Sequence, residues 1–233
     1  MREDFMLIYK ALPYLLKGCI VTLGLVGGSL SLGFIIGIPI TIGQVYSNKY
    51  IAGLVSVYVW FFRGIPVLVL LFLFYFGIFS LIGLNLSSFT TVLLVLGLIS
   101  AAYQSQIFRG SIQSIGEGQM LAARSLGMSK VQAIWNIILP QALRISIPAW
   151  SNEYASILKD SAIAYALGVT EILTRGNFTA TRTFKTMPIY LTVAIIFIIL
   201  TYGGMKIFDL LENKMQIPGY AERRAEFKQD AEE

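Results

Sequence analysis

Two carboxylates and a lysine interrupt an otherwise apolar segment in the second half of the chain. Glu153 and Asp160 are seven residues apart, which places them within about 20° of the same face of an α-helix. Ser156 lies on that face between them, whereas Lys159 lies off it. A charge near the centre of a bilayer costs about 2.5–3.5 kcal/mol. The acids therefore either pair with a buried cation such as Arg63 or with groups of a partner subunit, or they line a path and bind the positive part of a solute.

Further polar side chains occur within other apolar runs. Asn152 precedes Glu153, and Tyr103 and Gln104 are adjacent in an earlier run, so their amide and hydroxyl groups are candidates for contact with the same solute. In Arg63-Gly64-Ile65-Pro66 the proline removes a backbone donor and the glycine eases a bend. This bend is either a packing kink beside an interfacial arginine, or an opening whose backbone groups, with Arg63, hold a carboxylate.

The composition excludes several other kinds of chemistry. The 233 residues include no histidine and one cysteine, Cys19, so histidine catalysis, histidine metal sites and an internal disulfide are impossible. A net charge of +5 suits nucleic acid only as an exposed basic face, and here the basic residues flank apolar runs. No clustered nucleophile and base occur outside residues 145–167, which disfavours a membrane enzyme. We expect neither catalytic residues nor a metal in this chain.

The apolar runs predict an all-α membrane protein. Hydrophobic residues make up 56% of the chain and charged residues 13%, about half the charged share of soluble domains. A membrane-spanning helix needs about 20 mainly apolar residues. Five runs qualify, at 20–42, 52–79, 89–108, 145–167 and 188–208. The second contains the bend before Pro66 and is followed by a turn at 80–88, and the fourth is the weakest because of its charges.

These spans divide the chain into three parts. Residues 1–17 form an amphipathic segment before the first span, 18–212 form the five-span domain, and 213–233 form a charged tail. Ten of the 18 Lys and Arg residues then lie on the side of the tail and of residues 109–144, and six on the other. Because basic loops stay in the cytoplasm, we expect the carboxyl terminus to be cytoplasmic and the amino terminus to be outside.

The segment 109–144 contains a short helix that ends at a glycine. Residues 119–126 are good helix formers, and Gly127 follows where a left-handed residue commonly ends a helix. Ser129 then caps a second helix that we expect to end before Pro140. A short helix at the membrane surface is either a docking element for a partner or an amphipathic helix lying in the lipid interface.

This segment resembles the coupling loop in the permease subunits of ATP-binding-cassette importers. That loop has the spacing E-A-A-x3-G-x9-I-x-L-P, and Ala122-Ala123, Gly127 and Ile137-x-Leu139-Pro140 keep it here. Leu121 stands where the motif has its glutamate. The resemblance implies that this helix, as a coupling helix between spans three and four, docks on a cytoplasmic ATPase. The implied docking residues are Gln119, Met120, Leu121, Ala122, Ala123, Arg124, Ser125, Leu126 and Gly127.

Other stretches resemble the polar-amino-acid permeases, the histidine/arginine/glutamine permease family, in particular. These stretches are Arg63-Gly-Ile-Pro66, Ala102-Tyr103, 107–115, 139–142 and 158–161. Gln106 stands where the family usually has a glutamate. The chain itself has no G-x-x-x-x-G-K-[ST] phosphate loop, so ATP and Mg belong on a partner.

The resemblance implies a permease subunit in a prokaryotic cytoplasmic (inner) membrane. It implies a dimer with itself or a related permease, two cytoplasmic ATPase subunits and an extracytoplasmic solute-binding protein that reaches the outer loops, including 170–185. The solute is a polar amino acid, and a basic one is favoured if Glu153 and Asp160 both line the path. Two alternatives stay open: a structural subunit whose dimer mate holds the path, and a proton-coupled carrier that uses these acids as relays.

Overall fold

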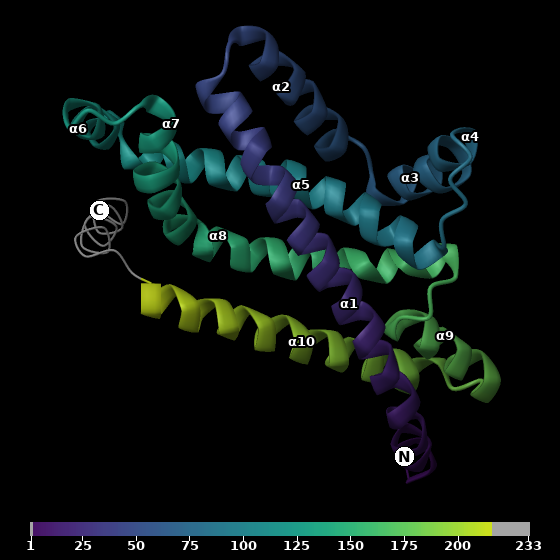
Figure 1. Ribbon diagram of the computed structural model, residues 1–233. Coiled ribbons are helices and arrows are strands. Elements are labelled where there is room, and N and C mark those ends of the chain that lie inside the picture. Colours follow the sequence, from purple (N-terminus) through teal and green to yellow (C-terminus); the bar gives the residue numbers. More distant parts are fainter. Residues whose placement is uncertain (1, 216–233) are drawn as a thin grey trace, which may run out of the picture.

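The computed structural model describes residues 2–215, and every element in this range is helical (Figure 1). The elements include the π-helical segments η1 and η2 and the 3-10 segment η3. Their bounds are α1 (Arg2–Tyr46), α2 (Lys49–Gly64), α3 (Val67–Phe72), η1 (Leu73–Ile78), α4 (Phe79–Leu81), α5 (Ser88–Ile115), α6 (Glu117–Ser125), α7 (Lys130–Ala133), η2 (Ile134–Ile138), α8 (Leu139–Asp160), η3 (Ser161–Leu167), α9 (Ile172–Thr183) and α10 (Thr186–Met215). The all-α prediction is confirmed.

Helix α5 lies at the centre of the bundle. It packs against α1 and α8, and α8 packs in turn against α10. Helices α5, α8 and α10 therefore lie side by side, and α1 crosses them obliquely (Figure 1). The short helices α6 and α7 gather at one end. The other end carries α4, α9 and the amino-terminal turns of α1.

Glycines allow α1 to approach α5 closely. A Cβ on Gly28 would lie 2.7 Å from Leu93, and one on Gly33 would lie 2.8 Å from the Ser100 hydroxyl. On the α5 side, a Cβ on Gly97 would lie 2.5 Å from Leu32. Small residues at such crossings are the usual basis of helix packing in lipid, where apolar side chains gain little from meeting each other.

Three helices are long and apolar enough to cross a membrane. They are Phe5–Tyr46, Ser88–Ile115 and Thr186–Met215, and the bent pair Lys49–Gly64 and Val67–Leu81 makes up to a fourth. The expected span at 145–167 is absent from this set of described helices. The reason is physical: α8 carries Arg144, Glu153, Lys159 and Asp160, which lower its hydropathy.

The bend before Pro66 is confirmed and is sharper than a kink. Helix α2 ends at Gly64, Ile65 has extended backbone angles (φ −103°, ψ 136°), and the next helix leaves at 107° to α2. Pro66 has no N–H to continue α2, and its ring disfavours a helical conformation at Ile65. The expected turn at 80–88 is also present, with Gly83 at φ +74°.

Helix α1 runs unbroken from Arg2 through the first span, so the division after residue 17 corresponds to no break in the helix and stays a prediction. Two other predicted boundaries were wrong. Helix α5 continues to Ile115 rather than ending near residue 108. The helix that begins after Ser129 does not end before Pro140 but continues through η2 into α8. The wider turn of a π-helix relieves the clash that the proline ring would make with the carbonyl four residues earlier.

The expected outer loop at 170–185 contains a helix, α9, whose start is capped by a buried acid. The Glu171 carboxylate accepts hydrogen bonds from the backbone N–H groups of Leu173 (2.7 Å) and Thr174 (2.6 Å) and from the Thr174 hydroxyl (2.9 Å). Burial raises the pKa of Glu171, and these hydrogen bonds oppose the rise. Of the expected tail at 213–233, the first three residues belong to α10, and the rest lies outside the described residues.

Candidate functional site

A cavity of about 240 Å³ lies where the α2–α3 break meets α5 and α8. Residues of the break, of α5 and of α8 line it. The lining residues are Phe62, Ile65, Val67, Ile99, Tyr103, Glu153, Ser156, Ile157, Lys159 and Asp160. The cavity therefore brings together four of the predicted path residues, Tyr103, Glu153, Ser156 and Asp160.

The lining from α8 follows helical periodicity. Glu153, Ser156, Ile157 and Asp160 occupy positions i, i+3, i+4 and i+7, which share one face of a helix. The two acids reach the same cavity as their seven-residue spacing predicts. Lys159, which the spacing placed off this face, also lines the cavity, because its long side chain can reach around the helix. An ammonium and two carboxylates thus line one partly open cavity.

Glu153 is held by a neutral hydroxyl rather than by a cation. Ser100 of α5 donates to Glu153 Oε1 at 2.7 Å, and both residues are buried. Ser100 Oγ accepts from Gln104 Nε2 (3.0 Å), and Gln104 Oε1 accepts from Trp150 Nε1 (2.7 Å). Gln104 Nε2 also donates to the Leu30 carbonyl of α1 at 3.0 Å. This buried chain of hydrogen bonds joins α1, α5 and α8 behind the cavity.

Two predicted path residues lie away from the cavity. Gln104 is fully buried in the hydrogen-bond chain just described, so it supports Glu153 from behind. Asn152 is exposed on α8 and does not contribute to the cavity lining. Helical spacing explains the second case, because Asn152 is turned by about 100° from Glu153.

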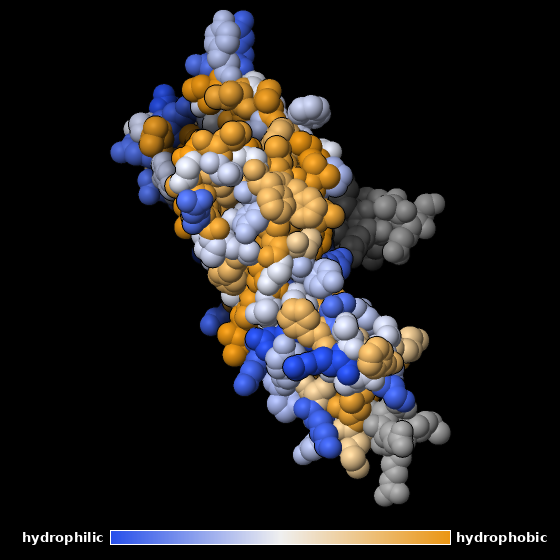
Figure 2. All heavy atoms as spheres, turned by 90° about the vertical axis from the view of Figure 1, so that its right-hand side faces the viewer, coloured by the Kyte–Doolittle hydropathy of each residue, from blue (hydrophilic) through white to orange (hydrophobic). Residues whose placement is uncertain are grey.

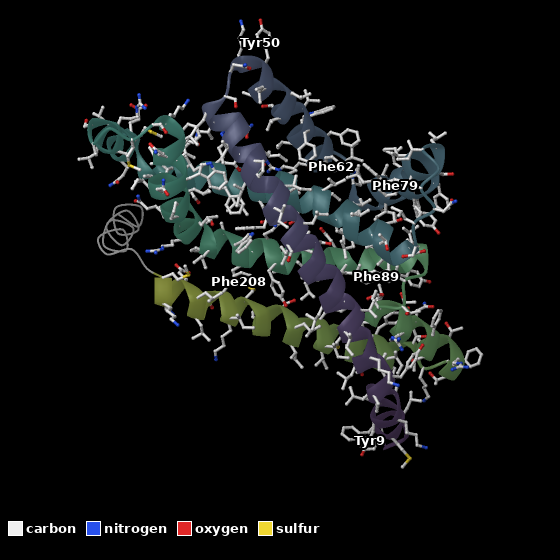
Figure 3. All side chains as sticks on the ribbon, in the orientation of Figure 1. Tyr9, Tyr50, Phe62, Phe79, Phe89 and Phe208 are labelled. Atoms are coloured by element: carbon white, nitrogen blue, oxygen red, sulfur yellow. The ribbon has the colours of Figure 1, made fainter. Side chains whose placement is uncertain are left out.

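Arg63, a third predicted path residue outside the cavity lining, contacts a residue that lines it. Its guanidinium lies 4.8 Å from the centre of the Tyr103 ring, and Tyr103 lines the cavity. Arg63 is exposed at the end of α2, next to the break. Figure 3 shows Phe62, the preceding residue, at the same end of α2; its ring lies 6.0 Å from that of Phe74 across the break.

The opposite side of α8 packs on α10 through aromatic rings. Phe208 of α10 meets Trp150 at 6.0 Å and Tyr154 at 5.7 Å, and it lies between the two helices in Figure 3. The Tyr154 hydroxyl donates to the Leu200 carbonyl at 2.9 Å. α8 is therefore fixed on one side to α5 and on the other to α10, and the cavity face has a defined orientation.

The second candidate region is α6, which projects from one end of the bundle (Figure 1). Gly116 before it (φ +76°) and Gly127 after it (φ +84°) both adopt left-handed backbone angles, as predicted for Gly127. The Ser129 cap is confirmed and forms a capping box with Gln132. Two of the nine predicted docking residues, Met120 and Ala123, are partly or fully buried against the bundle, and the other seven are exposed.

Large apolar side chains are exposed on and beside α6. Leu121 is 70% exposed and Leu126 84% exposed. Lys130 of the neighbouring α7 donates to the Tyr46 carbonyl at the end of α1 (2.9 Å), and its ammonium lies 5.4 Å from the centre of the Tyr46 ring. α6 thus presents an apolar surface on a support that is tied to α1.

The sequence interpretation missed two residues of the site. Lys159 carries a detectable signal, since it is adjacent to Asp160 in the same apolar run. Ser100 carries almost none, because one serine in an apolar helix is ordinary. The spacing of Ser100 and Gln104, four residues apart, is the only hint that they share a face.

The family of the chain follows from comparisons with known proteins. Residues 29–217 match the family described as binding-protein-dependent transport system inner membrane component. The probable amino-acid permease protein YxeN of Bacillus subtilis (strain 168) is 35% identical over 217 residues, which cover 92% of this chain and 97% of YxeN. The histidine/lysine/arginine/ornithine transport system permease protein HisM of Salmonella typhimurium is 31% identical over 210 residues, 86% of this chain and 89% of HisM.

A solved structure agrees with the sequence matches. A crystal structure of an amino acid ABC transporter with histidines has a chain that superposes with a TM-score of 0.81 at 33% identity, covering 90% of this chain and 98% of that one. The all-helical fold agrees with this likeness. The chain therefore belongs to the inner membrane components of binding-protein-dependent transport systems, as an amino-acid permease subunit of an ATP-binding-cassette importer.

Proposed function

We propose that the cavity between α5 and α8 is part of the path of a polar amino acid, and that Glu153 and Asp160 favour a basic one. The observation that carries this proposal is that both acids and Lys159 line one partly open cavity in an apolar bundle. Carboxylates bind a cationic side chain or an α-ammonium group, and an ammonium binds an α-carboxylate. The histidine, lysine, arginine and ornithine in the name of HisM, and the histidines of the solved transporter, are ligands of this kind.

In this proposal α8 and η3 form the fifth crossing of the bilayer. Their charges are compatible with a crossing because α8 packs against both α5 and α10, and Glu153 is buried between helices. Five crossings place the two termini on opposite sides. With the bias of basic residues, the carboxyl terminus, α6 and α7 lie in the cytoplasm, and α9 and the start of α1 lie outside.

Membership of the family implies ATPase and binding-protein partners, and ATP hydrolysis takes place in the separate ATPase chain. In our proposal, α6 docks on that ATPase through Leu121 and Leu126, with the rest of 119–127 around them. ATP and Mg are bound by the partner. The permease pairs with a second copy of itself or a related chain, and the binding protein contacts the outer end.

The test is uptake by the assembled importer in liposomes of defined composition. The permease is co-purified with its ATPase from native membranes, any second permease chain is identified by mass spectrometry, and uptake of labelled arginine and glutamine is measured with binding protein and ATP. We expect Glu153→Gln to lower arginine uptake about tenfold or more and Asp160→Asn to lower it as well. The exposed Asp209 of α10 supplies the matched control, Asp209→Asn.

Three results would contradict parts of this proposal. Full uptake by both cavity variants would place the path in the partner permease. Uptake without ATP that stops when a proton gradient is collapsed would indicate a proton-coupled carrier. Equal losses for arginine and glutamine would show that the acids do not select a basic solute.

A further inference from the structure

A groove lies between the amino-terminal turns of α1 and helix α9, at the opposite end of the molecule from α6. Its volume is about 270 Å³. Both helices contribute to it. The lining residues are Leu7, Lys10, Ala11, Tyr14, Phe178, Thr179, Arg182 and Thr183.

The two walls of the groove are held together by close packing next to it. A Cβ on Gly18 would lie 2.8 Å from the backbone of Ile172, so the glycine lets α1 touch the start of α9. Leu15 and Ile172 are fully buried in one apolar cluster. The Arg175 guanidinium lies 4.7 Å from the centre of the Tyr14 ring, and its Nε donates to the Thr170 carbonyl at 3.0 Å. The groove therefore has fixed walls.

The charge of the groove is positive. Lys10 from α1 and Arg182 from α9 face it from opposite walls, and both are exposed. Apart from Glu3 and Asp4 near the start of the chain, where Arg2 precedes them, the sequence has no Asp or Glu before Glu117, and Glu171 is the only one from 161 to 208. Glu171 is fully buried and its oxygens cap α9. An anion that entered the groove would meet two cations from two different helices.

The rest of the groove is apolar or aromatic. Tyr14 is 40% exposed and Phe178 45% exposed. Tyr9, at the end of α1 that projects furthest in Figure 3, is also exposed. Figure 2, which looks onto this end of the molecule, shows hydrophilic and hydrophobic side chains intermixed over its lower part, where α9 and the start of α1 lie. Aromatic rings beside basic side chains are typical of the level of lipid headgroups.

The position of the groove on α1 agrees with a place at the level of the lipid headgroups. The apolar stretch Phe5–Tyr46 has 42 residues, about 63 Å of helix, whereas the hydrocarbon layer is about 30 Å thick. Because α1 crosses the bundle obliquely, its surplus turns emerge to the side, beyond the outer end of α10 (Figure 1). They run toward surrounding lipid and not along the axes of α5, α8 and α10.

We propose that this groove binds the headgroup of an anionic phospholipid. Lys10 and Arg182 contact the phosphate, the Tyr14 hydroxyl donates to it, and Leu7 and Phe178 pack against the glycerol and the first methylenes of the acyl chains. Arginine is well suited to a phosphate because its planar guanidinium donates two parallel hydrogen bonds. An acidic surface of a binding protein would pair with the two cations. It would offer no apolar contact to Leu7 and Phe178 at the lipid-facing side.

The test uses the complete permease–ATPase complex in nanodiscs of phosphatidylcholine with a minor share of phosphatidylglycerol. Native mass spectrometry counts the phosphatidylglycerol retained after transfer to detergent. We expect Lys10→Gln and Arg182→Gln each to weaken retention about fivefold. The double variant should fall to the background level, and Phe178→Ala should weaken retention without a change in charge. Lys17→Gln is the matched control, because Lys17 is an exposed lysine of α1 that does not line the groove.

Two further arms distinguish the ligand. Retention that survives excess inorganic phosphate supports a lipid, whereas displacement by inorganic phosphate shows that a free anion is the ligand and overturns the proposal. The affinity for the binding protein is measured in pure phosphatidylcholine nanodiscs. A loss there in Lys10→Gln and Arg182→Gln, with phosphatidylglycerol retention unchanged, shows a protein-docking surface and also overturns it. Equal retention by the wild type, the double variant and Lys17→Gln would do the same.

Discussion

The hydroxyl of Ser100 donates a 2.7 Å hydrogen bond to the carboxylate of Glu153, so a residue of α5 holds the acid that α8 presents to the cavity. Both residues are buried, and Ser100 is in turn held by Gln104. The orientation of Glu153 is therefore set by a neighbouring helix.

Replacing Ser100 by alanine should destabilise the permease. A hydrogen bond to a charged group is worth about 1.5–3 kcal/mol, so Ser100→Ala should lower the free energy of unfolding, measured by SDS titration of the detergent-solubilised protein, by about that amount. Ser56→Ala on α2 is the control, because Ser56 is exposed; its hydroxyl donates within its own helix to Ala52 (2.8 Å) and accepts from Gln44 at the surface (3.2 Å). Equal effects of the two substitutions would refute the special role of Ser100.

A methyl group at Gly33 should disturb the same hydrogen bonds from the side of α1. Its Cβ would lie 2.5 Å from Gln104 Nε2 and 2.8 Å from Ser100 Oγ. Overpacking of this kind costs about 1–3 kcal/mol. Gly27→Ala in the same helix has no atom within 4 Å of its Cβ, and alanine suits a helix better than glycine by about 0.5–1 kcal/mol. In the same unfolding assay, Gly33→Ala should be destabilising and Gly27→Ala neutral or stabilising.

The exposed leucine of α6 should contribute to ATPase binding. Burial of a leucine side chain is worth about 1.5–3 kcal/mol, so Leu121→Ser should weaken binding of the ATPase subunit to permease nanodiscs about tenfold or more. Leu81→Ser is the matched control, because Leu81 is 86% exposed at the other end of the bundle. Unchanged affinity for Leu121→Ser would show that this position does not dock.

The buried cap Glu171 should make stability depend on pH. Because burial raises its pKa in the folded state above the ordinary 4.5, the folded protein binds the proton more tightly than the unfolded chain. The contribution of this group is thus fully present below the unfolded pKa and is lost as pH rises through the folded pKa. Glu171→Gln removes the titration, so its melting temperature relative to wild type should rise from about pH 4 to neutral pH.

The control for this prediction is Glu117→Gln, at an exposed acid of α6. Its melting temperature relative to wild type should change little across the same range. A Glu171→Gln curve that falls relative to wild type with rising pH would mean that the capping hydrogen bonds outweigh the burial.

The sequence predicted those parts of the fold that depend on local chemistry. Long runs without charges correspond to α1, α5 and α10, Pro66 ends a helix because it lacks an N–H, and Gly127 ends α6 in a left-handed conformation. The errors came from context. Pro140 was expected to end a helix, but η2 accommodates it. The close contact of Gly18 with α9 likewise depends on the arrangement of helices, which no local pattern specifies.

In the candidate site, too, local features could be predicted and features that depend on several helices could not. Seven-residue spacing was enough to predict that Glu153 and Asp160 share a face, because that depends only on helix geometry. The role of Gln104 depends on Trp150, Leu30 and Ser100. These residues come from three helices whose arrangement no local pattern specifies. Lys159 was set aside by its angle, although the length of its side chain compensates for the turn.

Helix α1 connects the end of the molecule that carries α9 with the end that carries α6 and α7. It touches the backbone of α9 at Gly18 and is clasped by Lys130 at Tyr46, 28 residues or about 42 Å away. Between these points it crosses α5 on the glycines at 28 and 33. Helix α1 is thus one continuous element that contacts α9 at one end, α7 at the other and α5 between them. A tilt of α1 about its contact with α5 would displace its two ends in opposite directions, and because Gly33 lies against Ser100 and Gln104, the same tilt would alter the hydrogen bonds behind the cavity.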